Sequence, residues 1–156
     1  MKVEHLMTQK VCTCSPAATL EEAARLMWEA DLGCLVVTDA DQKPLGMITD
    51  RDIAMAAYTQ GITLRESHVQ SAMSKTVLTC TRESPIGEVE ALMQTGQIRR
   101  VPVVGAGERL VGIVTLGDLA RDAESGATRL PALPGLAKTL CAVTTPRARE
   151  IGAAAE

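Results

Sequence analysis

The chain has 156 residues, of which 46% are hydrophobic and 22% are charged, so it falls in the ordinary globular range and is long enough to bury one sizeable core. A formal net charge of -3 offers no broad positive field to a nucleic-acid backbone, and one Trp, one Tyr and no Phe leave few side chains for base stacking. No apolar run approaches the roughly 18 residues of a membrane span, and the N-terminal residues do not form a signal peptide, so we expect a cytoplasmic protein without nucleic-acid or membrane partners.

The first predicted elements are a short strand and a helix. Lys10 to Ser15 favours the strand, and Thr19-Leu-Glu-Glu22 is a Thr-x-x-Glu capping box, which is typical of a helix start. Apolar residues at helical spacing follow and predict the buried face of this helix: Leu20, Ala23, Ala24 and Met27.

A hairpin and a second helix come next. Cys34 to Thr38 is apolar and β-prone, Asp39 to Pro44 has turn chemistry, and Leu45 to Thr49 returns as a strand. A helix is predicted from Asp50 onward, and Gly61 would end it.

The same order of elements is predicted a second time, because the sequence aligns with itself without a gap. The alignment pairs Met7 with Met73 and Asp52 with Asp118. The second set comprises a strand over Thr76 to Thr81, a helix entered at Ser84-Pro85, strands over Val101 to Val104 and Leu110 to Thr115, and a helix from Leu116 to about Glu124.

The predicted fold is therefore α/β (α+β), with two tandem β-α-β-β-α repeats at residues 1–66 and 67–124. One such unit is too small to bury both faces of its sheet, so we expect the repeats to pack as one pseudo-twofold module. We expect residues 125–156 to be a weakly ordered tail, in which only Leu136 to Val143 is compatible with a short helix or strand.

Each repeat carries a Gly-x-x-Thr-x-x-Asp motif, at Gly46 to Asp52 and at Gly112 to Asp118. The Thr is predicted at a helix N-cap, where free N-H groups and the helix dipole attract an anion such as phosphate. The Asp in the first turn is able to accept hydrogen bonds from ribose hydroxyls, and the Gly lets a ligand or a facing backbone come close. Thr-x-x-Asp is also a capping box that needs no ligand, but its recurrence in both repeats favours binding.

The ensemble resembles a tandem pair of cystathionine-β-synthase (CBS) domains, a Bateman module, over about residues 3 to 124. The resemblance rests on Met7-Thr8 and Met73-Ser74 at the repeat starts, the Val-x-Thr strands, Arg100-Val-Pro-Val-Val104 and both Gly-x-x-Thr-x-x-Asp motifs.

This resemblance implies two clefts for an adenosine ligand such as AMP, ADP, ATP or S-adenosylmethionine, and a flat homodimer formed through the helices. Asp52 and Asp118 would hold ribose, and Thr49 and Thr115 would lie near ribose or phosphate. The adenine would lie on residues of the first strand and of the helix-to-strand junction: Cys12, Leu32 and Gly33 in one cleft, and Leu78 and Ile98 in the other.

The two clefts are not expected to be equivalent. Arg99-Arg100 precedes the Val-Pro-Val-Val strand, whereas the first repeat has Gly33-Cys34 at the matching positions. In similar family members a basic pair there reaches the phosphates, although a solvated surface pair is the alternative. Arg51 is a weaker phosphate candidate.

We expect no catalytic residue, no metal site and no required cofactor. The sequence has no nucleophile elbow and no phosphate-binding Gly-x-x-x-x-Gly-Lys loop, and its five cysteines fit no common zinc pattern. The expected function is a non-enzymatic sensor that binds an adenosine nucleotide and signals to an unknown regulated protein in trans. A ligand-free dimerisation module and an S-adenosylmethionine binder are the alternatives, and an enzyme is the least favoured class.

Overall fold

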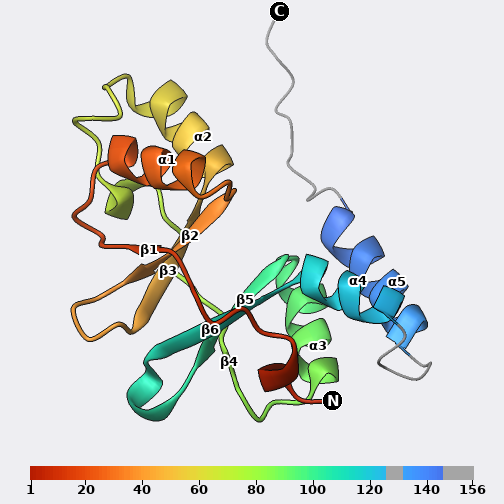
Figure 1. Ribbon diagram of the computed structural model, residues 1–156. Helices are drawn as coiled ribbons and strands as arrows, with labels where there is room; N and C mark the ends of the chain where they lie inside the picture. Colours follow the sequence, from red (N-terminus) through yellow and green to blue (C-terminus); the bar gives the residue numbers. More distant parts are fainter. Residues whose placement is uncertain (126–131, 146–156) are drawn as a thin grey trace, which may run out of the picture.

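The structure is a computed structural model and describes residues 1–125 and 132–145 (Figure 1). It confirms two repeats of the predicted β-α-β-β-α order, each a three-stranded mixed sheet with helices. In chain order the elements are η1 (Val3–His5), β1 (Thr13–Cys14), α1 (Leu20–Glu29), β2 (Cys34–Thr38), β3 (Pro44–Thr49), α2 (Asp50–Gln60), η2 (Val69–Ser71), β4 (Cys80–Thr81), α3 (Ile86–Gly96), β5 (Arg100–Val104), η3 (Ala106–Glu108), β6 (Leu110–Thr115), α4 (Leu116–Ser125) and α5 (Ala132–Thr144).

The two sheets have the same topology and register. The middle strand pairs in parallel with the first strand and antiparallel with the third, in the orders β1-β2-β3 and β4-β5-β6. Cys34 pairs with Thr49 in one sheet, and Arg100 pairs with Thr115 in the other. The register therefore places each motif Thr beside the residue that opens the middle strand.

The predicted first strands are too long. Only Thr13–Cys14 and Cys80–Thr81 pair in the sheets, because the preceding residues cross to the other repeat. Thr8 forms an antiparallel bridge with Ile113 on β6, with both backbone hydrogen bonds at 2.9 Å. Residues 9 to 12 span the distance between the two sheets.

The helix signals of the first repeat are confirmed. Thr19 caps α1, with the Glu22 N-H donating to Thr19 Oγ1 at 3.1 Å and the Thr19 N-H donating to Glu22 Oε2 at 2.8 Å. Leu20, Ala23 and Met27 on this helix are buried. Gly61 ends α2 with a φ of 66°, a left-handed conformation that suits glycine.

The two hydrophobic cores cross the predicted boundary between the repeats. Val3 and Met7 belong to the core of the second repeat, together with Val89 and Met93. Val69 belongs to the core of the first repeat. The repeats thus exchange short segments and form one body, with the sheets meeting in the middle and the helices at either end (Figure 1).

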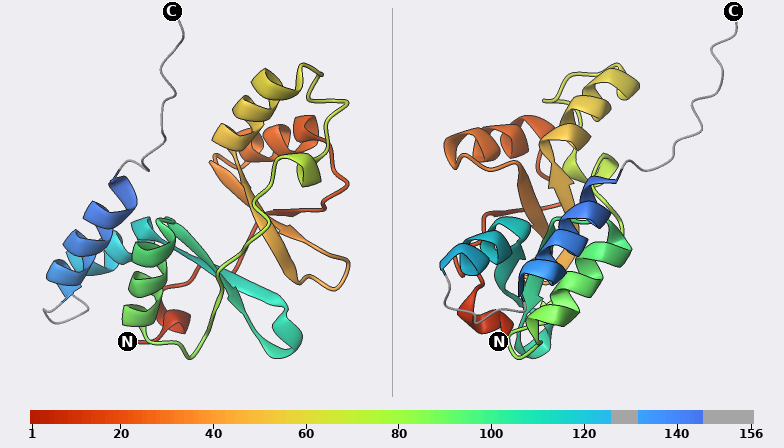
Figure 2. Two further views of the ribbon diagram at one scale, coloured as in Figure 1. Left: turned by 180° about the vertical axis from the view of Figure 1, so that it is seen from behind. Right: turned by 90° about the vertical axis from the view of Figure 1, so that its right-hand side faces the viewer.

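Within the segment predicted as a weakly ordered tail, residues 125–156, a helix is present where Leu136 to Val143 was compatible with a short helix or strand. Residues 132 to 144 form helix α5, which lies along α3 and also contacts α4 (Figure 2). Leu136 and Val143 are buried, and Gln94 Nε2 donates to Thr139 Oγ1 at 2.8 Å. The helix is stabilised by packing against α3, and the sequence of the helix does not indicate this contact. Residues 126–131 and 146–156 of the predicted tail lie outside the described residues.

No helix among residues 1–125 and 132–145 has the length and apolarity needed to cross a membrane.

Candidate functional site

The two motif threonines and aspartates form capping boxes of matching geometry. Thr115 donates to Asp118 Oδ2 from its backbone N-H at 2.7 Å and from Oγ1 at 2.7 Å, and it accepts from the Asp118 N-H at 3.2 Å. Thr49 and Asp52 repeat these contacts at 2.9, 2.7 and 3.2 Å. The capping role is thus present in both repeats and involves Oδ2 of each carboxylate. The other oxygen, Oδ1, takes no part in the cap.

A cleft of about 230 Å³ lies between the repeats and contains residues of both. It brings together five of the residues predicted to bind a ligand. Cys12 and Leu32 come from the first repeat, and Arg100, Thr115 and Asp118 come from the second. The predicted adenine side and the predicted ribose side of one cleft therefore belong to different repeats, since the N-terminal segment crosses over.

The motif glycines make this crossing possible. A Cβ atom at Gly46 would collide with the carbonyl oxygen of Ser74, and one at Gly112 would stand 3.1 Å from the carbonyl oxygen of Thr8. The sequence predicted that either a ligand or a facing backbone comes close to these glycines. At both glycines the facing backbone does so.

The cleft is rich in cationic side chains. Lys10, Arg100 and Arg121 line it together with a single carboxylate, that of Asp118, which is 8% exposed. Arg121 donates a hydrogen bond to Asp118 Oδ1. Neither Lys10 nor Arg100 forms an ion pair with a carboxylate in the part of the chain that the structure describes. The cleft therefore offers positive charge to an anion.

Lys10 and Arg121 were not predicted from the sequence. Arg121 stands three residues after Asp118, so helical spacing would have indicated it. Lys10 had no such signal, because its place in the cleft follows from the crossing of the N-terminal segment.

Three predicted residues of this region lie outside the cleft lining. Arg99 and Arg51 are exposed and do not line it. Gly33 lies at its edge, where a Cβ atom would be 3.6 Å from Arg100 Nη2 and 3.5 Å from Asp50 Oδ2. Of the predicted basic pair, Arg100 is therefore the member that faces the cleft.

The two adenine candidates of the other predicted cleft do not line this cavity. Leu78 and Ile98 are half-buried and both pack beside Gly96, where a Cβ atom would lie 2.8 Å from Leu78 Cδ1. The second cleft, with Leu78 and Ile98, stays a prediction. The positions equivalent to the three cations of the first cleft carry uncharged residues: Thr76, Cys34 and Met55.

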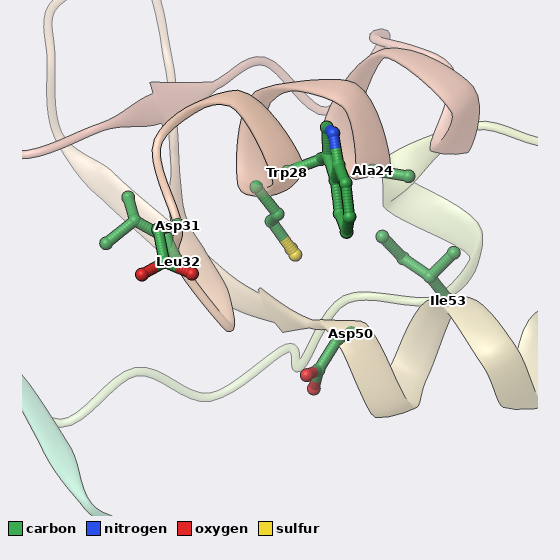
Figure 3. A pocket seen from close by; sticks show the side chains of 7 residues that line it. Ala24, Trp28, Asp31, Leu32, Asp50 and Ile53 are labelled. Carbon is green, nitrogen blue, oxygen red and sulfur yellow. The ribbon is translucent and has the colours of Figure 1, made fainter.

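A further cavity of about 280 Å³ lies on the helices of the first repeat, between α1 and the start of α2 (Figure 3). Ala24 and Trp28 lie on one side of it, and Asp50 and Ile53 on the other. Trp28 is 88% exposed. The lining of the cavity is mainly apolar, which suits packing against another protein surface better than catalysis.

The corresponding surface of the second repeat is covered by α5. Glu90, Gln94 and Gln97 match Ala24, Trp28 and Asp31 of the cavity. Gln94 bonds Thr139, and Gln97 Nε2 donates to the Ala142 carbonyl at 3.4 Å. A Cβ atom at Gly135 would lie 2.9 Å from both carboxylate oxygens of Glu90. The cavity is thus the uncovered counterpart of the surface that holds α5.

The buried thiols have raised pKa values. Burial raises the pKa of Cys14 and of Cys80 to about 11, and the cysteines form no disulfide. Among the described residues, no group of three or more His, Cys, Asp or Glu is placed to hold a metal ion. These side chains provide no activated thiolate.

Comparison with known proteins confirms the resemblance seen in the sequence. The family model described as CBS domain matches residues 3–58 and 68–124. The CBS domain-containing protein YhcV of Bacillus subtilis is 39% identical over 118 residues, which is 76% of this chain and 82% of YhcV. An uncharacterised 17.7 kDa protein of Acidianus ambivalens is 37% identical over 120 residues, 77% of this chain and 71% of its own.

A solved structure shares the fold. The CBS domain pair of protein MJ0100, solved in complex with methylthioadenosine and S-adenosyl-L-methionine, superposes with a TM-score of 0.70 at 28% identity. The match covers 78% of this chain and 98% of the MJ0100 chain.

Proposed function

This chain belongs to the CBS domain family as a tandem pair of repeats, and from that premise we propose that it is a non-enzymatic sensor of adenosine nucleotides. AMP, ADP or ATP would bind in the cleft between the repeats and change their relative orientation. A regulated protein that has different affinities for the two orientations would read this change in trans. The nucleotide acts as a regulatory ligand, so no cofactor is required.

The cleft beside Asp118 carries this proposal. Its apolar side, with Cys12 and Leu32, suits a purine ring, and the Asp118 carboxylate suits ribose hydroxyls. Arg100 supplies positive charge for phosphate. The three kinds of group that an adenosine nucleotide needs thus line one cavity.

The relative MJ0100 supports an adenosine ligand, because its CBS pair was solved with two adenosine compounds. S-adenosylmethionine remains the alternative ligand on this ground. The cationic lining favours a phosphate-bearing ligand over this positively charged sulfonium.

A ligand-free dimerisation module is the second candidate function. It is favoured by the exposed apolar surface of the first repeat, where Trp28 is 88% and Tyr58 83% exposed. A homodimer is also expected for the sensor, so a dimer alone does not separate the two functions. We expect either function to be exercised in the cytoplasm, where the free cysteines stay reduced.

Titration calorimetry with ATP, AMP and S-adenosylmethionine separates the two candidates. The sensor is expected to bind at least one of them at or below millimolar concentration. Absence of binding by all three at millimolar concentration would leave the dimerisation module as the better assignment.

Replacement of Asp118 by Asn tests the ribose contact. D118N removes the charge but keeps an oxygen for the helix cap, so the nucleotide is expected to bind roughly ten- to a hundredfold more weakly. E22Q is the matched control, because Glu22 forms the same kind of capping box with Thr19 on α1 and does not line the cleft. Calorimetry should show unchanged binding by E22Q. If D118N binds as well as E22Q, Asp118 serves only as a cap.

A further inference from the structure

Because of Arg121, the two motif aspartates differ in their hydrogen bonds. Its Nη2 donates to Asp118 Oδ1 from one turn further along α4. Thr115 donates twice to the other oxygen, Oδ2. Both oxygens of the Asp118 carboxylate are therefore engaged within the protein.

Asp52 in the first repeat lacks this additional contact. It receives the same two hydrogen bonds from Thr49 at Oδ2. Met55 stands at the position equivalent to Arg121, and a thioether cannot donate to a carboxylate. Within the described part of the chain, no donor bonds Oδ1 of Asp52.

The arginine side chain lies against the start of α4. A Cβ atom at Gly117 would be 3.4 Å from Arg121 Nη1 and 3.5 Å from Thr115 Oγ1. The guanidinium therefore folds back over Gly117 toward the motif. The first repeat has Arg51 instead of this glycine, so both residues that define the arrangement differ between the repeats.

Of the about four acceptor positions of a carboxylate, Thr115 uses two and Arg121 one, so a vicinal diol, which donates two hydrogen bonds, needs the position that Arg121 takes. The Asp118 side chain is 8% exposed and is fixed by the helix cap, whereas the side chain of Arg121 is 72% exposed. Because the arginine is the more exposed partner, it is the group that moves when hydroxyls arrive. We propose that Arg121 is a latch on Asp118 that a ligand must displace, and that only a phosphate-bearing adenosine ligand displaces it efficiently.

The cleft offers the displaced guanidinium a new partner when phosphate is present. Lys10 and Arg100 line the same cavity without ion pairs to described carboxylates. A phosphate chain drawn to them would replace the Asp118 ion pair that Arg121 loses. Adenosine offers no such replacement, and the sulfonium of S-adenosylmethionine would repel the three cations. The latch thus makes ribose recognition depend on phosphate.

This inference rests on the proposed function and is tested with the same titration. Native chain, R121Q and R25Q are titrated with ATP and with adenosine. The amide NMR signals of Thr115 and Asp118 assign the binding to this cleft. R25Q is the matched control, because Arg25 is also an exposed helical arginine paired with a carboxylate, Glu29 at 3.2 Å, and it does not line the cleft.

The expected result is a change of opposite sign for the two ligands. R121Q should bind ATP about tenfold more weakly, because a phosphate contact is lost, and adenosine a few fold more tightly, because Asp118 is free. R25Q should bind both as the native chain does. If R121Q binds ATP as tightly as the native chain does, or binds both ligands more weakly to the same degree, the latch is wrong and the proposed function is unaffected. Failure of the native chain to bind ATP and adenosine here, and AMP in the titration above, would overturn the proposed function and the latch with it.

Discussion

At the scale of single residues, one side chain in this protein often has a structural and a chemical role together. Asp118 caps α4 through Oδ2, accepts from Arg121 at Oδ1, and lines the cleft. Gly46 and Gly112 serve structure alone, because the facing chain occupies the space that a side chain would need. The motif is therefore a point where packing requirements and the proposed ligand contact coincide.

Replacement of Gly46 by Ala is expected to destabilise the fold by roughly 2–4 kcal/mol, since the added methyl collides with rigid backbone at Ser74. Gly87 on α3 is the control, because a Cβ atom there has no neighbour within 4 Å. G87A should be neutral or stabilise by up to about 1 kcal/mol through helix propensity. Urea unfolding measures the free energy of unfolding of G46A and G87A. Equal values would contradict the close contact between Gly46 and the backbone of Ser74.

The buried thiols predict a loss of stability in alkali. The pKa of Cys14 and of Cys80 is about 11 in the folded chain, above the ordinary value of 9.0. The unfolded chain therefore loses these protons first, and the free energy of unfolding falls as the pH rises from about 9 to about 11. The fall should approach roughly 2–3 kcal/mol per thiol. Urea unfolding of a C14A/C80A variant should show a shallower decline, and parallel pH profiles would refute the assignment.

At the scale of elements, helix α5 makes the two repeats unequal. It covers α3 and α4, whereas the matching surface on α1 and α2 stays open. Its buried side chains Leu136 and Val143 join the core of the second repeat. The helix is thus part of the folded body.

Truncation of Leu136 tests this role. L136A should lower the free energy of unfolding by roughly 2–4 kcal/mol, because the side chain is buried against α3 and α4. L140A on the same helix is the control, since Leu140 is 41% exposed, and its effect should stay below about 1 kcal/mol. Urea unfolding measures both variants. Similar values for the two would mean that α5 is not docked.

At the scale of the whole molecule, the uncovered face of the first repeat is where a homodimer is expected. Trp28 is exposed there and lines the cavity between α1 and the start of α2. Because α5 covers the matching face of the second repeat, we expect two copies to meet through their first repeats. This geometry differs from a flat dimer that uses both helical faces equally.

Replacement of Trp28 by Glu should convert the expected dimer to a monomer at micromolar concentration, because a charge would be buried at the centre of the interface. L140E is the control, since it places the same charge on an exposed position of α5. Sedimentation velocity measures the oligomeric state. A native monomer, or a dimer that survives W28E, would exclude this interface.

Much of the fold and part of the site could be predicted from the sequence. The capping boxes at Thr19 and Thr49 and the stop at Gly61 are local signals, so they indicated helix boundaries directly. The repetition of Gly, Thr and Asp identified the motif residues, and Cys12, Leu32 and Arg100 do line the cleft with Asp118. For helix α5 the sequence left helix and strand open over Leu136 to Val143, and the docking on α3 was not predicted, because it depends on contacts with α3.

The sequence by itself determined the two repeats, their element order and the chemistry of the motif, because these depend on local patterns and on recurrence. Only the tertiary structure decided that the N-terminal segment crosses to the other repeat, which carries Lys10 and Cys12 into the cleft of Asp118. It also decided that α5 covers one helical face. Such pairings join residues that no local pattern relates, since they arise when the segments pack.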